Sequence, residues 1–197
     1  MGSRSDVVLA ANAESTVTWY TDTPRILEYF YVSTGVRWTR DNALKISWCT
    51  YFAHWVLVKA GITPLPAVGT SDKLKSVGGS VGRFLHYTTD GLKKTGHAGN
   101  GVYSFHDVKT GGYQPKAGDL YYRSAQNYGN HVGVIVGVNG NQIYTVDGNG
   151  GPHGGDARFF IDWSKKPYVQ AIGKGFVDKP GAPKTLGAGD FYIEIPD

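Results

Sequence analysis

The residue with the clearest capacity for covalent chemistry is Cys49, the single cysteine of the 197-residue chain. It lies in the stretch SWCTYFAHWVLVKAG, which reads as a helix over 48–60 that ends at Gly61. On that helix it belongs to an apolar stripe formed by Cys49, Phe52, Ala53, Val56, Leu57 and Ala60. One interpretation is therefore a small buried core residue. The other is a nucleophile: with Ser47 as the cap, Cys49 lies in the first turn, where free N–H groups and the helix dipole stabilise a thiolate.

A cysteine nucleophile needs a base, and His131 is the histidine best placed to supply one. It opens the segment HVGVIVGV, residues 131–138, which alternates as a strand does. We expect the valine face of this strand to be core. The other face carries His131 and glycines, so a helix or a substrate can approach it closely. The alternative interpretation is an ordinary histidine at the end of a strand.

The other five histidines are weaker candidates. His54 is five residues along the helix from Cys49, which turns it well away from the thiol. His153 lies in GNGGPHGGDAR, where it either lines a cleft or decorates the surface. Three lie in loop-rich sequence without a partner pattern: His86, His97 and His106. No pair has metal-ligand spacing in a supporting context, and one cysteine excludes thiolate-rich zinc sites, so we predict no metal and no cofactor.

The elements that must position these residues change in kind along the chain. Helical patterns come first, over 24–33 and 48–60, with a further short helix over 71–77. Strand patterns follow, and 178–190 reads as a loop. The predicted strands cover 115–123, where a turn precedes the strand, and 131–138, 142–149, 166–173 and 191–195. Helices followed by strands indicate an α+β fold in which N-terminal helices pack on an antiparallel β-sheet.

Length and charge limit the class of protein. A chain of 197 residues is long enough for one sizeable core, so we predict a single domain over 1–197. The net charge of +4 favours anionic partners, but the 20 Lys and Arg are scattered and argue against a nucleic-acid groove. No apolar run approaches the ~18 residues of a membrane span. The apolar run Val7 to Ala11 is too short for a signal peptide.

Four segments, taken in order, resemble the papain-like cell-wall amidases, that is, the CHAP family and its NlpC-type relatives. They are WCTYFAHWVLVKAG for the nucleophile helix, PKAGDLYYR for the turn and strand before the histidine, HVGVIVGV for the histidine strand and IYTVDGNGG for the next strand. They cover residues 47–61 and 115–151. The resemblance implies a papain-like α+β fold and a thiol hydrolase that cleaves amide bonds in peptidoglycan stem peptides.

The resemblance also implies the roles of individual residues. Cys49 would be the nucleophile and His131 the general base, with Asp147 or Asn149 orienting the imidazole. The backbone N–H of Cys49 would be one oxyanion donor. Among the residues around these positions, we predict that three contact substrate: Trp48, Asn130 and His153.

One position departs from the family pattern. Many CHAP sequences carry Gln immediately before the cysteine, where this chain has Trp48. The second oxyanion donor must therefore come from elsewhere. Asn42 and Ser47 are the candidates.

Three functions are compatible with these observations. The first is a cysteine amidase or endopeptidase of bacterial or phage origin that acts on peptidoglycan at the cell wall, as a lysin, a housekeeping enzyme or a secreted antibacterial toxin. A toxin would imply a cognate inhibitor as partner. The second is a non-catalytic wall- or glycan-binding module, favoured by the 13 Tyr, 5 Trp and 28 Gly. The third is a papain-like hydrolase of another acyl substrate.

The hairpin formed by 131–138 and 142–149 decides whether His131 has an orienting partner. A two-residue turn at Asn139-Gly140 would place Asp147 on the opposite face of the sheet from His131. A three-residue turn over 139–141, or an equivalent bulge, would place Asp147 and Asn149 on the histidine face. We predict the second register, with Asp147 as the direct partner of His131 and Asn149 as a secondary contact near the end of the strand.

Overall fold

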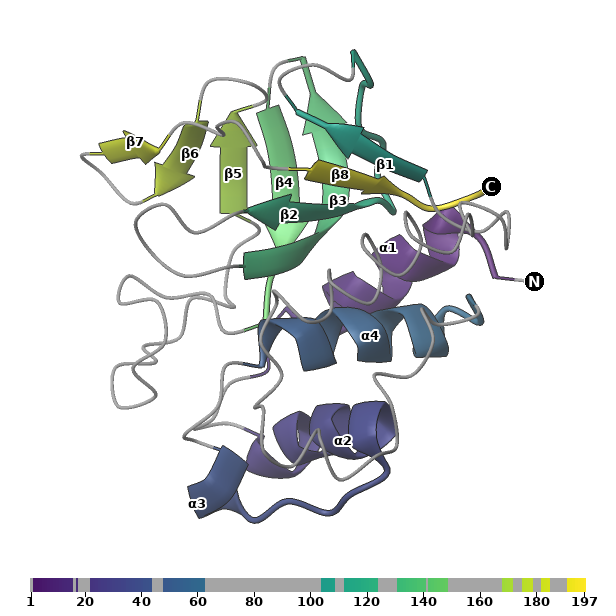
Figure 1. Cartoon of the computed structure of the whole chain (residues 1–197), viewed down its shortest axis with the longest axis vertical. Coiled ribbons are helices and arrows are strands. Elements are labelled where there is room, and N and C mark those ends of the chain that lie inside the picture. The colour runs from purple at the N-terminus through teal and green to yellow at the C-terminus, as the bar shows by residue number, and fades with distance from the viewer. Residues whose placement is uncertain are drawn as a thin grey trace.

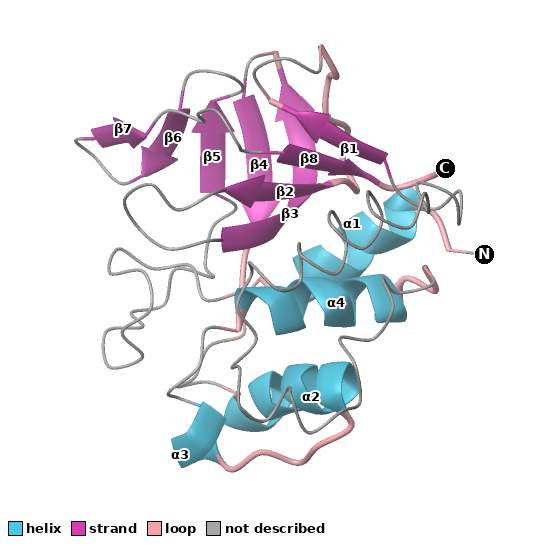
Figure 2. Ribbon diagram, in the orientation of Figure 1, coloured by secondary structure: helices cyan, strands magenta, loops and turns pink. Residues whose placement is uncertain are grey.

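The chain folds into an antiparallel sheet with helices packed against it, as the order of the sequence patterns predicts (Figure 1). Figure 2 shows the helices gathered on one side of the sheet, with α1 and α4 next to it and α2 and α3 beyond them. The computed structural model describes residues 2–15, 17, 22–43, 48–62, 104–108, 112–123, 131–140, 142–148, 168–171, 175–178, 182–184 and 191–197. The helix predicted over 71–77 lies outside these residues.

Local signals in the sequence explain where the first helices begin. Helix α1 (Arg4–Ala13) starts with a capping box in which Ser3 and Asp6 bond each other's backbone N–H. This helix was not predicted from the sequence. Helix α2 (Thr23–Thr34) confirms the helix predicted over 24–33, with Asp22 as its cap and Gly35 in the left-handed conformation after its end. Helix α3 (Arg40–Ala43) is a single short turn.

Helix α4 (Cys49–Lys59) confirms the helix predicted over 48–60. Its N-cap is Trp48, which makes no side-chain capping bond, so the expected cap at Ser47 is wrong by one position. Cys49 is nevertheless the first helical residue. At the other end Gly61 has φ +67°, and the N–H of Ile62 bonds the carbonyl of Leu57, the pattern that commonly ends a helix.

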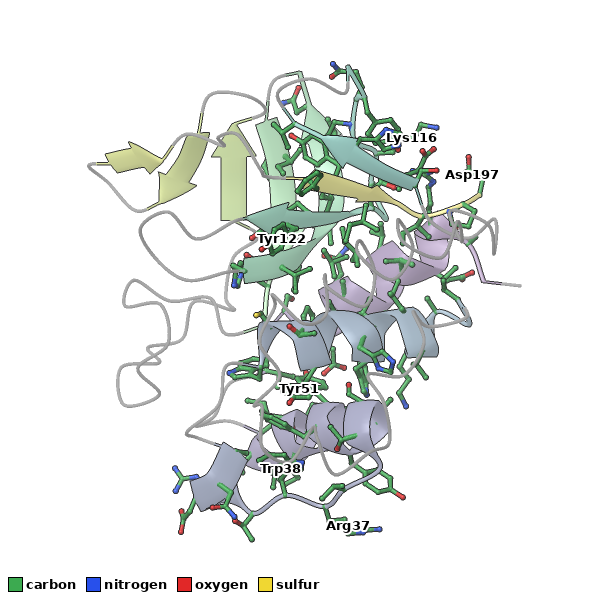
Figure 3. All side chains as sticks on the ribbon, viewed as in Figure 1. Arg37, Trp38, Tyr51, Lys116, Tyr122 and Asp197 are labelled. Atoms are coloured by element: carbon green, nitrogen blue, oxygen red, sulfur yellow. The ribbon has the colours of Figure 1, made fainter. Side chains whose placement is uncertain are left out.

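The surroundings of α4 differ from the one-sided stripe that the sequence predicts. Every residue from Cys49 to Leu57 is buried. The reason is that α4 lies between two layers, with strand β3 on one side and helix α2 on the other. Tyr51 lies between α4 and α2 (Figure 3), and its ring centroid is 4.4 Å from that of Phe30. A helix covered on both sides shows no single apolar face.

Eight described strands form one sheet in the order β1-β8-β2-β3-β4-β5-β6-β7. Their bounds are β1 Ser104–Asp107, β2 Leu120–Arg123, β3 His131–Asn139, β4 Gln142–Val146, β5 Tyr168–Ala171, β6 Gly175–Asp178, β7 Ala182–Lys184 and β8 Phe191–Glu194. Each of the five predicted strands is present. Strands β1 and β6 were not predicted, and the loop predicted over 178–190 is wrong at β7. That strand is at the edge of the sheet, where Pro183 is tolerated because an edge strand needs fewer N–H donors.

The β3–β4 hairpin reaches the predicted register by a bulge. At its tip Asn139 pairs with Gln142, so neither turn considered from the sequence is the one observed. The pairing then shifts between Ile135 and Gly137, and beyond the shift Val134 pairs with Val146. The extra residue, Val136, changes the register by one. The predicted equivalent bulge is therefore confirmed, and the three-residue turn is wrong.

The two faces of this hairpin have different neighbours, and the valine face is core, as the alternation in the sequence predicts. Val132, Val134 and Val146 belong to the core shared with α1 and α4, so the helices cover the valine face and not the glycine face. The close approach of α4 depends on Gly148, where a Cβ would collide with Phe52 and come within 3.0 Å of the Trp48 ring. Glycine at this position therefore lets the N-terminal end of α4 reach the end of the hairpin.

A buried ion pair connects the first helix to the residue that precedes β2. Arg4 Nη1 donates to Asp119 Oδ1 at 2.7 Å, and Asp119 is fully buried. The same carboxylate accepts from the backbone N–H of Lys116 at 2.8 Å and of Ile195 at 3.1 Å. Figure 3 shows Lys116 and Asp197 at the same end of the molecule. Asp119 thus fastens together α1, the turn before β2 and the segment that follows β8.

Candidate active site

Cys49, His131 and Asp147 meet where α4 approaches the end of the β3–β4 hairpin. Cys49 begins α4, His131 begins β3 and Asp147 follows β4 directly. His131 Nε2 lies 3.2 Å from Asp147 Oδ2. The Cys49 thiol and the His131 imidazole are close enough for each to shift the pKa of the other. Since Nε2 faces the carboxylate, Nδ1 is the nitrogen that remains for the thiol.

The surroundings of Cys49 favour a thiolate. The residue is 1% exposed, and burial by itself would raise the pKa of its thiol. The hydrogen bond and charge of His131 act against this effect, as do the backbone N–H of Val132 and the hydroxyl of Thr50, and the pKa of Cys49 is lowered. Its position at the first residue of a helix adds free N–H groups and the positive end of the helix dipole.

His131 has the complementary environment. Burial acts to lower the pKa of its imidazole, but the hydrogen bonds to Asp147 and Cys49 outweigh it and raise the pKa to about 9. The side chain of His131 is 14% exposed and that of Asp147 is 5% exposed, so this pair is shielded from water. A lowered thiol pKa beside a raised imidazole pKa favours a thiolate–imidazolium pair at neutral pH.

A fourth side chain touches this group and was missed by the sequence analysis. The Tyr121 hydroxyl of β2 donates to Asp147 Oδ2 at 2.6 Å, the same oxygen that faces His131. No local pattern in the sequence pointed to it, because the contact depends on the pairing of β2 with β3, which places Tyr121 opposite Gly133. A Cβ at Gly133 would collide with Asp147 and lie 2.5 Å from the Tyr121 ring. Gly133 therefore makes room for the carboxylate and the phenol together.

Two of the remaining predicted site residues, Trp48 and Asn42, have surroundings that do not connect them to this group, and the others lie outside the described residues. Trp48 is 7% exposed, and its ring stacks on that of Tyr29 at a centroid distance of 5.8 Å. This core position lends no support to the predicted contact with substrate. Asn42, a candidate oxyanion donor, is an exposed residue of α3. Six residues named in the sequence analysis lie outside the described residues: Ser47, His86, His97, Asn130, Asn149 and His153.

Two further histidines have defined surroundings. His54 is buried with its Nδ1 3.1 Å from the Ser33 hydroxyl of α2, and burial lowers its pKa to about 4. It therefore faces away from the sheet, as its helical position predicts. His106 is on strand β1, with Nε2 2.7 Å from Glu194 Oε2 and its ring stacked on Tyr113. The sequence around His106 reads as loop-rich and shows no partner pattern, whereas in the structure the residue is on a strand and the pairing of β1 with β8 supplies its partner.

The described residues contain no group of three or more His, Cys, Asp or Glu side chains with the spacing to hold a metal ion. None of the described helices has both the length and the apolar character needed to cross a bilayer.

Comparison with known proteins identifies the family. The family model described as the CHAP domain matches residues 40–149, which is more than half of the chain and includes all of α4, β2, β3 and β4. A search of curated proteins and a search of solved structures gave no significant match. The matched region contains Cys49, His131 and Asp147. The chain belongs to the CHAP domain family, a family of the cell-wall hydrolase and amidase type.

Proposed function

We propose that this protein is a cysteine amidase or endopeptidase with a papain-like active site, in which the whole chain forms one catalytic domain and hydrolyses amide bonds of peptidoglycan stem peptides. One observation carries the proposal: the contact between Cys49 at the start of a helix, His131 at the start of a strand and Asp147 beside it. Nucleophile, base and orienting group are the three parts that thiol hydrolysis needs.

In this mechanism the Cys49 thiolate attacks the carbonyl carbon of the scissile amide. The backbone N–H of Cys49, which is free at the first position of α4, donates to the oxyanion that forms. The His131 imidazolium gives its proton to the leaving amine, and the C–N bond breaks to leave a thioester on Cys49. His131 then takes a proton from water, the hydroxide attacks the thioester, and the carboxylic acid and the thiol are released.

Asp147 has a supporting task in this scheme. It accepts the Nε2 hydrogen bond of His131 and so fixes which ring nitrogen faces the thiol. Its negative charge also stabilises the imidazolium. Asn149 remains a proposed secondary contact of His131, as the sequence predicts.

The substrate class is supported by the family and by the charge of the chain. CHAP domains belong to cell-wall hydrolases, and peptidoglycan is the substrate that this membership implies. The net charge of +4 would help the protein to associate with an anionic bacterial wall. A secreted antibacterial role with a cognate inhibitor is a narrower version of the same proposal.

The proposal is tested with purified sacculi. Wild-type protein should reduce their turbidity and release new amino groups, and Cys49→Ala should do neither while melting at a similar temperature. New reducing sugar ends without new amino groups would indicate glycan cleavage and contradict the proposal. Binding of both proteins to sacculi without any turnover would favour the non-catalytic wall-binding module.

A further inference from the structure

We propose that Tyr121 is a positioning residue of this active site, whose hydroxyl holds the Asp147 carboxylate in the orientation that His131 requires. The inference rests on the proposed function, because it assigns a task within that catalytic group. Tyr121 does not contact the thiol in this proposal. It acts through Asp147.

The geometry assigns both donors to one carboxylate oxygen. Asp147 Oδ2 accepts from the Tyr121 hydroxyl at 2.6 Å and faces His131 Nε2 at 3.2 Å. Asp147 Oδ1 is buried and accepts no hydrogen bond from a described residue. Within the described part of the chain, the rotation of this carboxylate therefore depends on Tyr121 and on His131 itself.

His131 alone is a poor anchor, because its charge changes during turnover. It is an imidazolium before the leaving amine departs and a neutral imidazole afterwards. The Tyr121 hydroxyl takes no part in these proton transfers and is buried, 1% exposed, on an interior strand of the sheet. Such a donor on a rigid element holds the carboxylate in place when the imidazole has given up its proton.

The packing around Tyr121 also favours a role for its hydroxyl beside Asp147. Its ring lies 6.1 Å from the His131 ring, centroid to centroid, and it pairs across the strands with Gly133. The missing side chain at Gly133 is what lets the phenol and the carboxylate meet. If Tyr121 only filled the core, the residue opposite it would not need to be a glycine that leaves room for the Asp147 carboxylate.

The test compares Tyr121→Phe with Tyr192→Phe. Tyr192 is an equally buried tyrosine, in the same cluster and directly opposite Tyr121 on β8, so it controls for the loss of a buried hydroxyl. Tyr121→Phe should lower kcat on sacculus fragments about 10-fold with KM within about twofold, as expected for one hydrogen bond to a charged group. Tyr192→Phe should leave both values near wild type.

A second measurement needs no substrate. The rate of Cys49 alkylation by iodoacetamide is followed against pH, which reports the thiolate–imidazolium pair directly. In Tyr121→Phe the midpoint should move to higher pH by about half a unit to one unit, since a loosened Asp147 stabilises the imidazolium less. In an Asp147→Ala background, Tyr121→Phe should add no further change, because the partner through which it acts is gone.

The outcomes separate this inference from the proposed function. If wild type leaves sacculi intact, the substrate is wrong, but the alkylation profiles still test Tyr121. If wild type is active and Tyr121→Phe matches it in kcat and alkylation midpoint, the inference is overturned alone. Equal losses in Tyr121→Phe and Tyr192→Phe, or additive effects with Asp147→Ala, would also overturn it. Should Tyr121→Phe not fold, site-specific 3-fluorotyrosine at position 121 alters the donor strength and keeps the packing, and an unchanged midpoint would then count against the inference.

Discussion

At the residue scale, Cys49 combines two properties that a core cysteine does not need together. It is buried, yet it lies at a helix start beside the His131 imidazole and the Val132 N–H. Burial without such partners raises a thiol pKa, and these partners lower it. The choice between core residue and nucleophile can therefore be made by reactivity.

We expect Cys49 to react with iodoacetamide at pH 6 faster than a free thiol such as glutathione, because more of it is thiolate at that pH. Alkylation should abolish turnover and leave the circular dichroism spectrum unchanged. The modified residue is identified by peptide mass mapping. Slow labelling that accelerates only in denaturant would show that Cys49 is an ordinary buried core residue and not a nucleophile.

Replacement of the base should have a large and selective effect. We expect His131→Ala to lower turnover by at least about 100-fold, the typical effect of removing a general base. His54→Ala and His153→Ala should retain far more activity in the same sacculus assay. His54 is a useful comparison because it is buried on the same helix as Cys49 but bonds Ser33 of α2. Equal damage from His153→Ala and His131→Ala would show that the base has been misassigned.

The pH dependence of turnover follows from the raised pKa of His131. In the proposed mechanism activity needs the His131 imidazolium, which is present below its pKa and is lost as the pH rises through about 9. The hydrogen bond to Asp147 is the largest of the effects that raise this pKa. In Asp147→Asn the charge is removed, so the alkaline limb of the kcat/KM profile should move to lower pH. The same limb at wild-type pH in this variant would mean that Asp147 does not interact with the reacting imidazole.

At the scale of elements, the site exists because α4 and the β3–β4 hairpin meet closely. Gly148 lies at that contact, next to Phe52 and Trp48 of the α4 end. The bulge at Val136 sets the register that puts Asp147 on the histidine side. A small residue and an irregular pairing therefore bring the proposed catalytic residues together.

We expect Gly148→Ala to push the start of α4 away from the hairpin, because a Cβ there collides with Phe52. Turnover should fall about 10-fold or more and the free energy of unfolding by about 1–3 kcal/mol, the usual effect of overpacking. The measurements are sacculus turnover and urea denaturation. Gly137→Ala is the matched control, since its nearest neighbour would be an ordinary 3.6 Å contact with Tyr144. Similar losses in both variants would contradict the assignment of Gly148 to the helix–hairpin contact.

At the scale of the whole molecule, Asp119 connects parts of the chain that are far apart in sequence. It bonds Arg4 of α1, the turn before β2 and the backbone after β8. Gly118 has φ +97°, and a Cβ at this position would lie 2.5 Å from Arg4 Cβ and 2.8 Å from Arg4 Cα, so glycine lets this turn approach α1 closely. This arrangement holds α1 against the sheet, where it packs on β3 beside α4.

Arg4→Met should destabilise the protein by about 3 kcal/mol, since it leaves the fully buried Asp119 carboxylate without its counter-charge. Thermal unfolding measures the effect. Arg37→Met is the control, because Arg37 is exposed and lies over the Tyr31 ring. Its effect should stay within about 0.5 kcal/mol. Equal melting temperatures for Arg4→Met and wild type would mean that the ion pair contributes nothing net to the fold.

The sequence by itself determined the parts of this protein that depend on local pattern. The helices over 24–33 and 48–60 and the five predicted strands follow from periodicity, caps and turn residues, which act over a few neighbours. The same local rules placed Cys49 in a first turn and His131 at a strand start. The order of these segments also sufficed to indicate the α+β class and the family resemblance.

Only the tertiary structure decided which faces meet. The burial of α4 on both sides and the position of the bulge at Val136 depend on contacts between elements, which leave no periodic signal in one strand or helix. Tyr121 was invisible for the same reason: its role depends on a space at Gly133, on another strand, and on a carboxylate beyond the end of a third. Contacts of this kind join residues whose spacing along the chain is arbitrary, so they become readable only when the strands are paired and the helices are packed.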